Sequence, residues 1–122
     1  MAPTPWFKRH GQFRISNRTI GRWTVIEVSG KFIAGPPATE FLNAIEQALA
    51  SGSRRIVADL TAATLVDDAI AAAAPAAYHK VIMAGGLMKF VVLPGKAGGY
   101  YHMAGLELTL PTFTRLGGAI EL

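Results

Sequence analysis

The sequence predicts a single α/β domain with a central, mostly parallel sheet and an N-terminal β-hairpin. Apolar segments typical of strands alternate with segments whose apolar residues have helical spacing. Strand, helix and strand in this order imply parallel strands joined by right-handed crossovers. The 122 residues are enough for one domain that buries about two thirds of the surface exposed by its unfolded chain.

The first two strands are expected at 13–17 and 23–29, where apolar residues alternate and aromatic or β-branched residues are frequent. A turn with a glycine, at 18–22, separates them, and this arrangement predicts the β-hairpin. Residues 1–12 contain two prolines and are expected to form an extended N-terminal arm. The domain itself is then expected to occupy residues 13–122.

A helix and a strand should follow the hairpin. Pro36 and Pro37 are acceptable in the first turn of a helix, and the apolar residues of 38–49 have helical spacing. The Ser-Gly-Ser sequence at 51–53 should end this helix. The apolar run at 56–60 then predicts a short strand that is buried on both faces.

A second helix is expected from about Asp68 to Ala84, because this segment is rich in alanine and is followed by Gly85 and Gly86. Pro75 lies inside it, and a proline in a helix interior costs about 3 kcal/mol. We therefore expect either a kink at Pro75 or a helix that becomes regular only from Pro75 onward.

The last part of the chain has weaker patterns. A strand is predicted at 87–93, a weak helix at 97–103, a short strand at 108–110 and a small helix at 115–122.

The composition limits the classes of function. Half of the residues are hydrophobic and 16% are charged, which indicates an ordered globular protein. The net charge of +4 comes from basic residues spread along the chain, so a solvated basic edge is expected rather than a nucleic-acid site. The absence of cysteine excludes disulfides and thiolate chemistry and is compatible with the cytoplasm, where we expect the protein. No apolar run reaches the roughly 18 residues of a membrane span, so no direct membrane insertion is expected.

The most informative stretch runs from the strand at 56–60 to the second helix. The strand leads into Asp59, a short loop of small residues should follow, and Asp67 and Asp68 stand where the helix should begin. The unpaired N–H groups at a helix start favour a carboxylate or a phosphate. This stretch therefore predicts a regulated binding surface.

Catalytic and metal-binding alternatives have less support. Asp59, Asp67 and Asp68 could form an acidic pocket at the ends of strands, and three carboxylates suit Mg²⁺. His79 is expected on a solvated helix face and His102 in amphipathic packing, since neither belongs to a nucleophile or metalloprotease motif. We therefore expect no enzymatic activity, no cofactor and no metal.

Six short motifs occur at the ends of the predicted elements. They are Gly30, Asp59-Leu60-Thr61, Val66-Asp67, Gly85-Gly86, Gly105-Leu106 and Ala119-Ile120. Together, and with the spacing between them, they resemble the STAS domain of bacterial anti-sigma factor antagonists. The resemblance covers about residues 13–122 and implies a STAS-like domain with helices mainly on one side of the sheet.

The resemblance also implies a function, which is partner switching. Proteins of this family bind a kinase-like ATPase that otherwise sequesters a sigma factor, and they are released when a serine at the start of the second helix is phosphorylated. The family's Asp-Ser-Ser-Gly-like signature corresponds here to Asp67-Asp68-Ala69-Ile70, so Asp68 stands at the position of the phosphoserine. The implied partner surface comprises Asp67, Asp68, Ala69, Ile70 and the exposed part of the second helix, including Tyr78.

Asp68 has three interpretations, and the sequence leaves them open. It could be a plain helix N-cap, a fixed imitation of phosphoserine, or part of a surface adapted to another partner. An aspartate has one charge and two acceptor oxygens, whereas phosphoserine carries about −1.5 to −2 and three oxygens, so the imitation would be partial. Ile70 replaces a glycine and would reshape the partner contact. The alternative function is a STAS-like accessory subunit of a membrane transport ATPase complex.

Overall fold

The structure, a computed structural model, describes residues 7–10, 12–33, 35–66, 69–92 and 110–120. Along the chain these residues form β1 (Phe7–His10), β2 (Phe13–Ile20), β3 (Trp23–Phe32), α1 (Pro36–Ala50), β4 (Arg55–Val66), α2 (Ala69–Met83), β5 (Leu87–Val91), β6 (Thr112–Phe113) and α3 (Leu116–Ile120).

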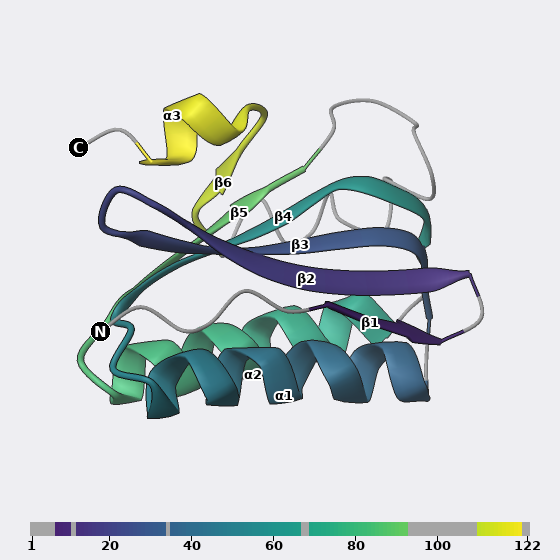
Figure 1. The fold of residues 1–122 in the computed structure, drawn as a ribbon, viewed down its shortest axis with the longest axis horizontal. Helices are drawn as coiled ribbons and strands as arrows, with labels where there is room; N and C mark the ends of the chain where they lie inside the picture. Colours follow the sequence, from purple (N-terminus) through teal and green to yellow (C-terminus); the bar gives the residue numbers. More distant parts are fainter. Residues whose placement is uncertain (1–6, 11, 34, 67–68, 93–109, 121–122) are drawn as a thin grey trace.

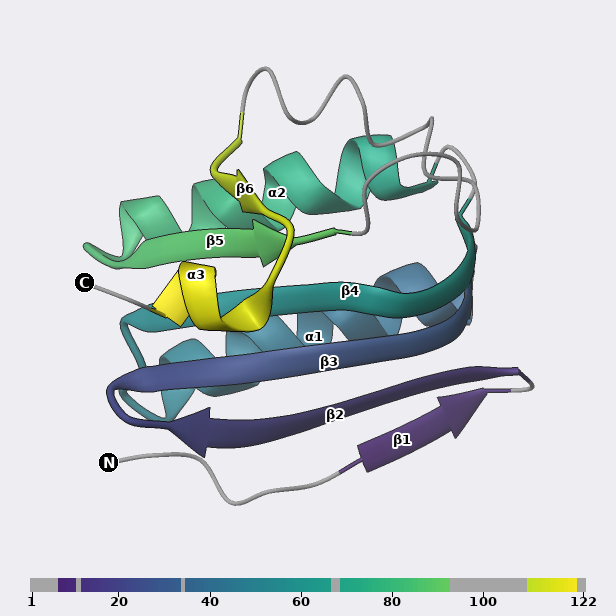
Figure 2. The same cartoon turned by 90° about the horizontal axis from the view of Figure 1, so that it is seen from above.

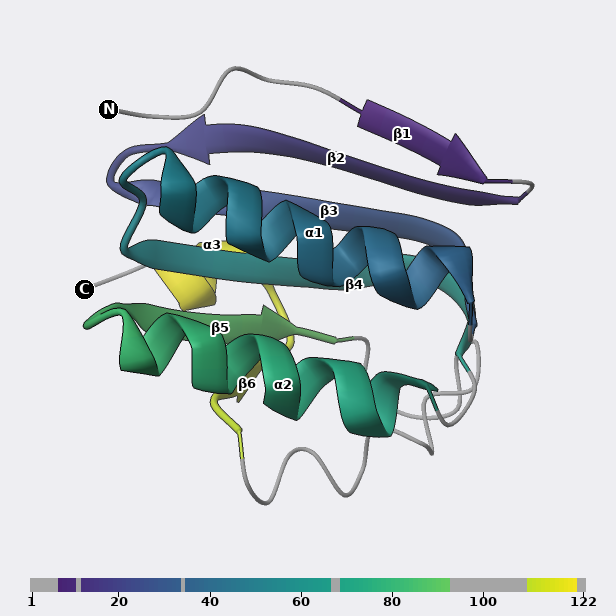
Figure 3. The same cartoon turned by 90° about the horizontal axis from the view of Figure 1, so that it is seen from below.

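The strands form one sheet in the order β1-β2-β3-β4-β5-β6. The pairs β1–β2 and β2–β3 are antiparallel, whereas β3–β4, β4–β5 and β5–β6 are parallel. Helices α1 and α2 lie side by side on one face of the sheet, and α3 lies on the other face (Figures 1 and 3). The predicted α/β fold, with its hairpin, largely parallel sheet and helices mainly on one side, is confirmed.

The main hydrophobic core fills the space between the sheet and the pair α1 and α2. Its largest side chains include Phe13, Phe32 and Phe41, whose rings follow one another with centroids 5.9 Å and 5.2 Å apart. From α2 the core receives mainly alanines, which let this helix approach the sheet closely. A smaller cluster on the opposite face joins α3 to the sheet, and its buried members are Trp23, Val25, Val57, Val91 and Ala119.

Three strands, β2, β3 and β4, are longer than the sequence predicts, and a fourth, β1, was not expected. The predicted loop of small residues after Leu60 is wrong, because β4 continues to Val66 and pairs with β3 along its length. The pairing of β3 and β4 contains two register shifts, and such irregularities let a strand bend without ending. Part of the expected N-terminal arm also forms a strand, since Phe7–His10 pairs with β2 at the edge of the sheet.

Helix α2 is continuous through Pro75, so the option that it becomes regular only from Pro75 is wrong. The Pro75 residue is exposed on the outer side of the helix. In the last part of the chain, β6 lies at Thr112–Phe113, and α3 (Leu116–Ile120) lies within the helix predicted at 115–122. Most of the strand predicted at 108–110, and the end of that helix at 121–122, lie outside the described residues. The predicted helix at 97–103 lies outside the described residues.

Candidate functional site

The predicted partner surface centres on the start of α2. The helix begins at Ala69, followed by Ile70, and the preceding strand β4 ends at Val66. In parallel sheets the carboxyl ends of the strands are the usual location of binding sites, and Val66 is the carboxyl end of β4. Asp67 and Asp68 lie outside the described residues, so their roles stay predictions.

Tyr78 lies away from this helix start. It is nine residues beyond Ala69, which corresponds to about 13 Å along the helix axis. Its side chain is half-buried and packs against the main core. The structure therefore does not bring Tyr78 together with the first turn of α2, and its role as a partner contact stays a prediction.

The exposed side of α2 is almost uncharged. From Ala72 onward, where burial is described, the exposed residues of the helix are Ala72, Pro75, His79, Ile82 and Met83. Met83 is 73% exposed and Ile82 is 41% exposed. The only Lys, Arg, Asp or Glu of the helix is Lys80, whose Nζ donates a hydrogen bond to Glu46 Oε2 of α1 over 2.8 Å. We call this row the α2 stripe; surfaces of this kind, apolar and poor in charge, are typical of protein interfaces.

A shallow groove joins the end of the α2 stripe to α1. It has a volume of about 510 Å³ and is lined by Glu46, Leu49, His79, Lys80, Met83 and Ala84. His79 is exposed, which confirms its predicted position on a solvated helix face. The sequence alone did not single out Met83, although a methionine at the end of an alanine-rich helix was the available signal.

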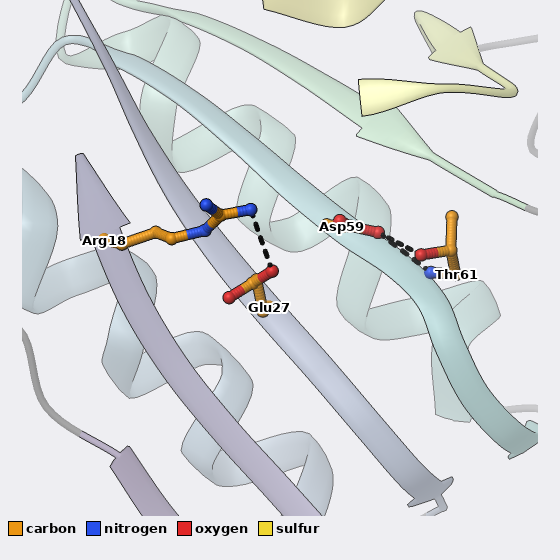
Figure 4. Close-up of polar contacts among 4 residues, drawn as sticks. All are labelled: Arg18, Glu27, Asp59 and Thr61. Carbon is orange, nitrogen blue, oxygen red and sulfur yellow. Dashed lines mark hydrogen bonds and ion pairs between the residues drawn. The ribbon is translucent and has the colours of Figure 1, made fainter. Parts of the chain in front are cut away.

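Asp59 belongs to the other face of the sheet. Its half-buried Oδ1 accepts hydrogen bonds from both the backbone N–H and the hydroxyl of Thr61, over 3.0 Å and 2.7 Å (Figure 4). Nearby on the same face, Arg18 and Glu27 form an ion pair of 3.3 Å. Asp59 therefore has a local structural role, since it fixes the backbone at Thr61 within β4.

The acidic-pocket interpretation gains no support from the described residues. Within the described ranges, no three His, Cys, Asp or Glu side chains lie close enough together to hold a metal ion. Asp59 is already bonded to Thr61, and its two suggested companions, Asp67 and Asp68, lie outside those ranges. His102 also lies outside them.

Comparison with known proteins identifies the fold. No protein-family model matches the chain, and no curated protein matches it in sequence. Among solved structures, an anti-sigma factor antagonist of Mycobacterium paratuberculosis superimposes with a TM-score of 0.65 at 24% identity, covering 96% of this chain and 90% of its own. A Thermotoga maritima protein described as a candidate anti-sigma factor antagonist gives a TM-score of 0.71 at 12% identity, with 85% and 89% covered. The unphosphorylated anti-sigma factor antagonist SpoIIAA gives 0.64 at 10% identity, with 85% and 91% covered.

The chain has the STAS fold. The resemblance inferred from its short motifs is confirmed at the level of the fold, because all three structures cover most of both chains. In the STAS fold of this chain, the start of α2 and the α2 stripe lie on one helix at the surface (Figure 3). Among the described segments, none of the helices combines the length and apolar character needed to span a membrane.

Proposed function

We propose that this chain is a non-enzymatic protein-interaction module of bacterial partner-switching regulation, similar to an anti-sigma factor antagonist. Its partner would be a kinase-like anti-sigma factor or a related ATPase in the cytoplasm. Support comes from the fold, which is shared with anti-sigma factor antagonists, and from the α2 stripe. The observation that carries the proposal is that this long exposed helix presents almost no charge to solvent.

The α2 stripe differs from the exposed side of α1 in a way that fits this role. The exposed residues of α1 are mostly polar or charged, and they are Pro36, Thr39, Asn43, Glu46, Gln47 and Ala50. Such a surface is well solvated and gains little from being covered. Apart from His79, the α2 stripe presents alanine, proline, isoleucine and methionine side chains, so covering it removes apolar surface from water at about 25 cal/mol per Å².

The start of α2 would then set the charge of the contact. No serine, threonine or tyrosine occurs from Asp67 to Ala77, so a kinase cannot switch this segment by phosphorylating a hydroxyl. We propose that Asp67, Asp68, Ala69 and Ile70 contact the partner, with Asp68 supplying a fixed negative charge. Two carboxylates next to the helix start suit a basic partner surface.

The test is affinity capture from lysate of the source cell, followed by mass spectrometry. The wild-type chain is compared with Ala72→Glu, which places a carboxylate on the α2 stripe, and with Asn43→Glu, which adds the same charge to the exposed side of α1. We expect a kinase-like ATPase to be recovered by the wild type and by Asn43→Glu, and to be lost with Ala72→Glu. Equal recovery by all three baits would exclude the α2 stripe from the contact.

A second candidate function is an accessory subunit of a membrane transport ATPase complex. The missing hydroxyl at the start of α2 favours it, because such a subunit needs no phosphorylation switch. The same capture experiment separates the two functions by the identity of the recovered ATPase. An ABC-type ATPase, lost with Ala72→Glu, would replace the first proposal with the second.

A further inference from the structure

A hollow lined by three arginines lies at the opposite end of the sheet from the first turn of α2. It is formed where the β2–β3 turn meets the connection from α1 to β4, at the amino ends of β3 and β4 (Figure 2). Its volume is about 330 Å³, and its lining residues are Thr19, Gly21, Arg22, Thr24, Gly52, Ser53, Arg54 and Arg55. We propose that this arginine hollow binds a small phosphorylated ligand, independently of the partner surface.

The charge of the arginine hollow is not neutralised by its lining. None of the lining residues is acidic. Within the described part of the chain, Arg18 forms an ion pair with Glu27 and Lys80 with Glu46, and neither acid lines the hollow. Three guanidinium groups around one small volume attract an anion and disfavour a cation.

Two of the guanidinium groups are held in place by uncharged groups. Arg54 Nη1 donates hydrogen bonds to the backbone oxygens of Leu49 and Ser53, over 3.0 Å and 2.7 Å. The Arg55 guanidinium lies 5.8 Å from the centre of the Trp23 ring. These contacts orient the side chains but leave their charges available, which reduces the entropy lost when a ligand binds.

Hydroxyl groups complete the lining. Thr24 Oγ1 and Ser53 Oγ are 2.6 Å apart and share a hydrogen bond, and Thr24 is only 4% exposed. One hydroxyl proton is used in this bond, so the other hydroxyl still has a proton to donate. Guanidinium groups beside a fixed hydroxyl donor match the acceptor oxygens and the charge of a phosphate group.

A second hollow adjoins the first and is more apolar. It has a volume of about 300 Å³ and is lined by Ile20, Gly21, Arg22, Trp23 and Ile120, so it shares Gly21 and Arg22 with the arginine hollow. No side chain at Gly21 separates the two, and a Cβ there would meet nothing within 4 Å. The pair therefore fits a phosphorylated metabolite whose phosphate lies among the arginines and whose ring or apolar part lies beside Ile20.

The test is isothermal titration calorimetry with pyrophosphate and with ADP at low ionic strength. Arg22→Gln removes one guanidinium from a turn, and Arg22→Gln/Arg54→Gln removes two. Each lost charge-assisted hydrogen bond weakens binding by about ten-fold or more, so the dissociation constants should rise about ten-fold and about 100-fold. The control Arg14→Gln/Arg18→Gln removes two charges from β2 outside the hollow and should change them by less than about three-fold.

Three results would overturn the proposal or one part of it. Failure of wild type to bind either probe at millimolar concentration would exclude a phosphate site. An equal loss in the control double variant would show attraction by net charge rather than by the arginine hollow. ADP that binds no more tightly than pyrophosphate would remove the ring-binding role of the adjoining hollow, whereas tighter binding of ADP supports it. The thermal unfolding of Arg22→Gln is measured as well. If it is unchanged, the higher dissociation constant of this variant reports the lost guanidinium group and not a loss of folded protein.

Discussion

Gly30 gives the sharpest test of how the sheet is packed. It pairs with Phe13 of β2, and its φ of +81° lies in the region that favours glycine. A Cβ atom at this position would overlap the backbone oxygen of Gln12, which also accepts a hydrogen bond from the N–H of Lys31. Gly30→Ala must therefore both strain the backbone and move the β1–β2 connection away from β3.

The two costs can be separated with a matched control. Positive-φ strain in a residue with a side chain costs about 1–2 kcal/mol. Overlap in a packed region adds about 1–3 kcal/mol, so Gly30→Ala should lower the free energy of unfolding by about 2–5 kcal/mol. Gly85 has a similar φ of +83°, but a Cβ there meets nothing within 4 Å, so Gly85→Ala should cost only the strain.

Urea denaturation followed by circular dichroism measures both variants. The two variants should differ by about 1–3 kcal/mol, the cost of the overlap. With a slope of about 1–3 kcal/mol per molar urea, this difference separates their midpoints by about 0.3–3 M. Equal free energies of unfolding for Gly30→Ala and Gly85→Ala would refute the close approach of Gln12 to β3.

Three further predictions concern single side chains. Phe32→Ala should lower the free energy of unfolding by about 3–5 kcal/mol, because Phe32 is fully buried between two other rings; a loss below about 1 kcal/mol in chemical denaturation would contradict this packing. Asp59→Ala should cost about 1–2 kcal/mol in the same assay, whereas Thr61→Ser, which keeps both donors, should cost clearly less; equal losses would argue against the bonds to Asp59. Lys80→Ala should cost less than about 1 kcal/mol, and less again in high salt, because its ion pair with Glu46 is exposed; a larger, salt-independent loss in thermal unfolding would contradict this.

The sequence predicts the regular elements well where apolar periodicity is strong. The hairpin around Gly21, the helix after Pro36 and the strand after Arg55 all follow from local patterns. The extension of β4 does not, because the bulky apolar run that predicts the strand ends at Leu60 and the smaller Thr61, Ala62 and Ala63 follow. They form a strand since β3 offers them backbone partners, with Ala62 and Ala63 opposite Ser29 and Gly30.

Two features of the surface, the arginine hollow and the α2 stripe, depend on tertiary contacts that local sequence patterns do not predict. Arg22 lies far from Arg54 and Arg55 along the chain, and only the meeting of two turns brings them to one hollow. Similarly, the alanines of α2 predict a helix but do not tell which of them face the sheet. The buried Ala73, Ala74 and Ala77 lie on the inner side of the helix, and the exposed residues from Ala72 onward form the α2 stripe.

The proposed contact of this chain with a kinase-like ATPase is centred on the start of α2. Its most direct test is the affinity of that purified ATPase for the wild type, Asp68→Ser and Asp68→Ala, measured with and without ATP. If Asp68 supplies a fixed negative charge to a basic partner surface, both variants should raise the dissociation constant by about ten-fold. ATP should alter the binding of Asp68→Ser alone, because only this variant has a hydroxyl that the kinase can phosphorylate at this position. Identical dissociation constants for all three proteins, with or without ATP, would contradict a contact between Asp68 and the ATPase.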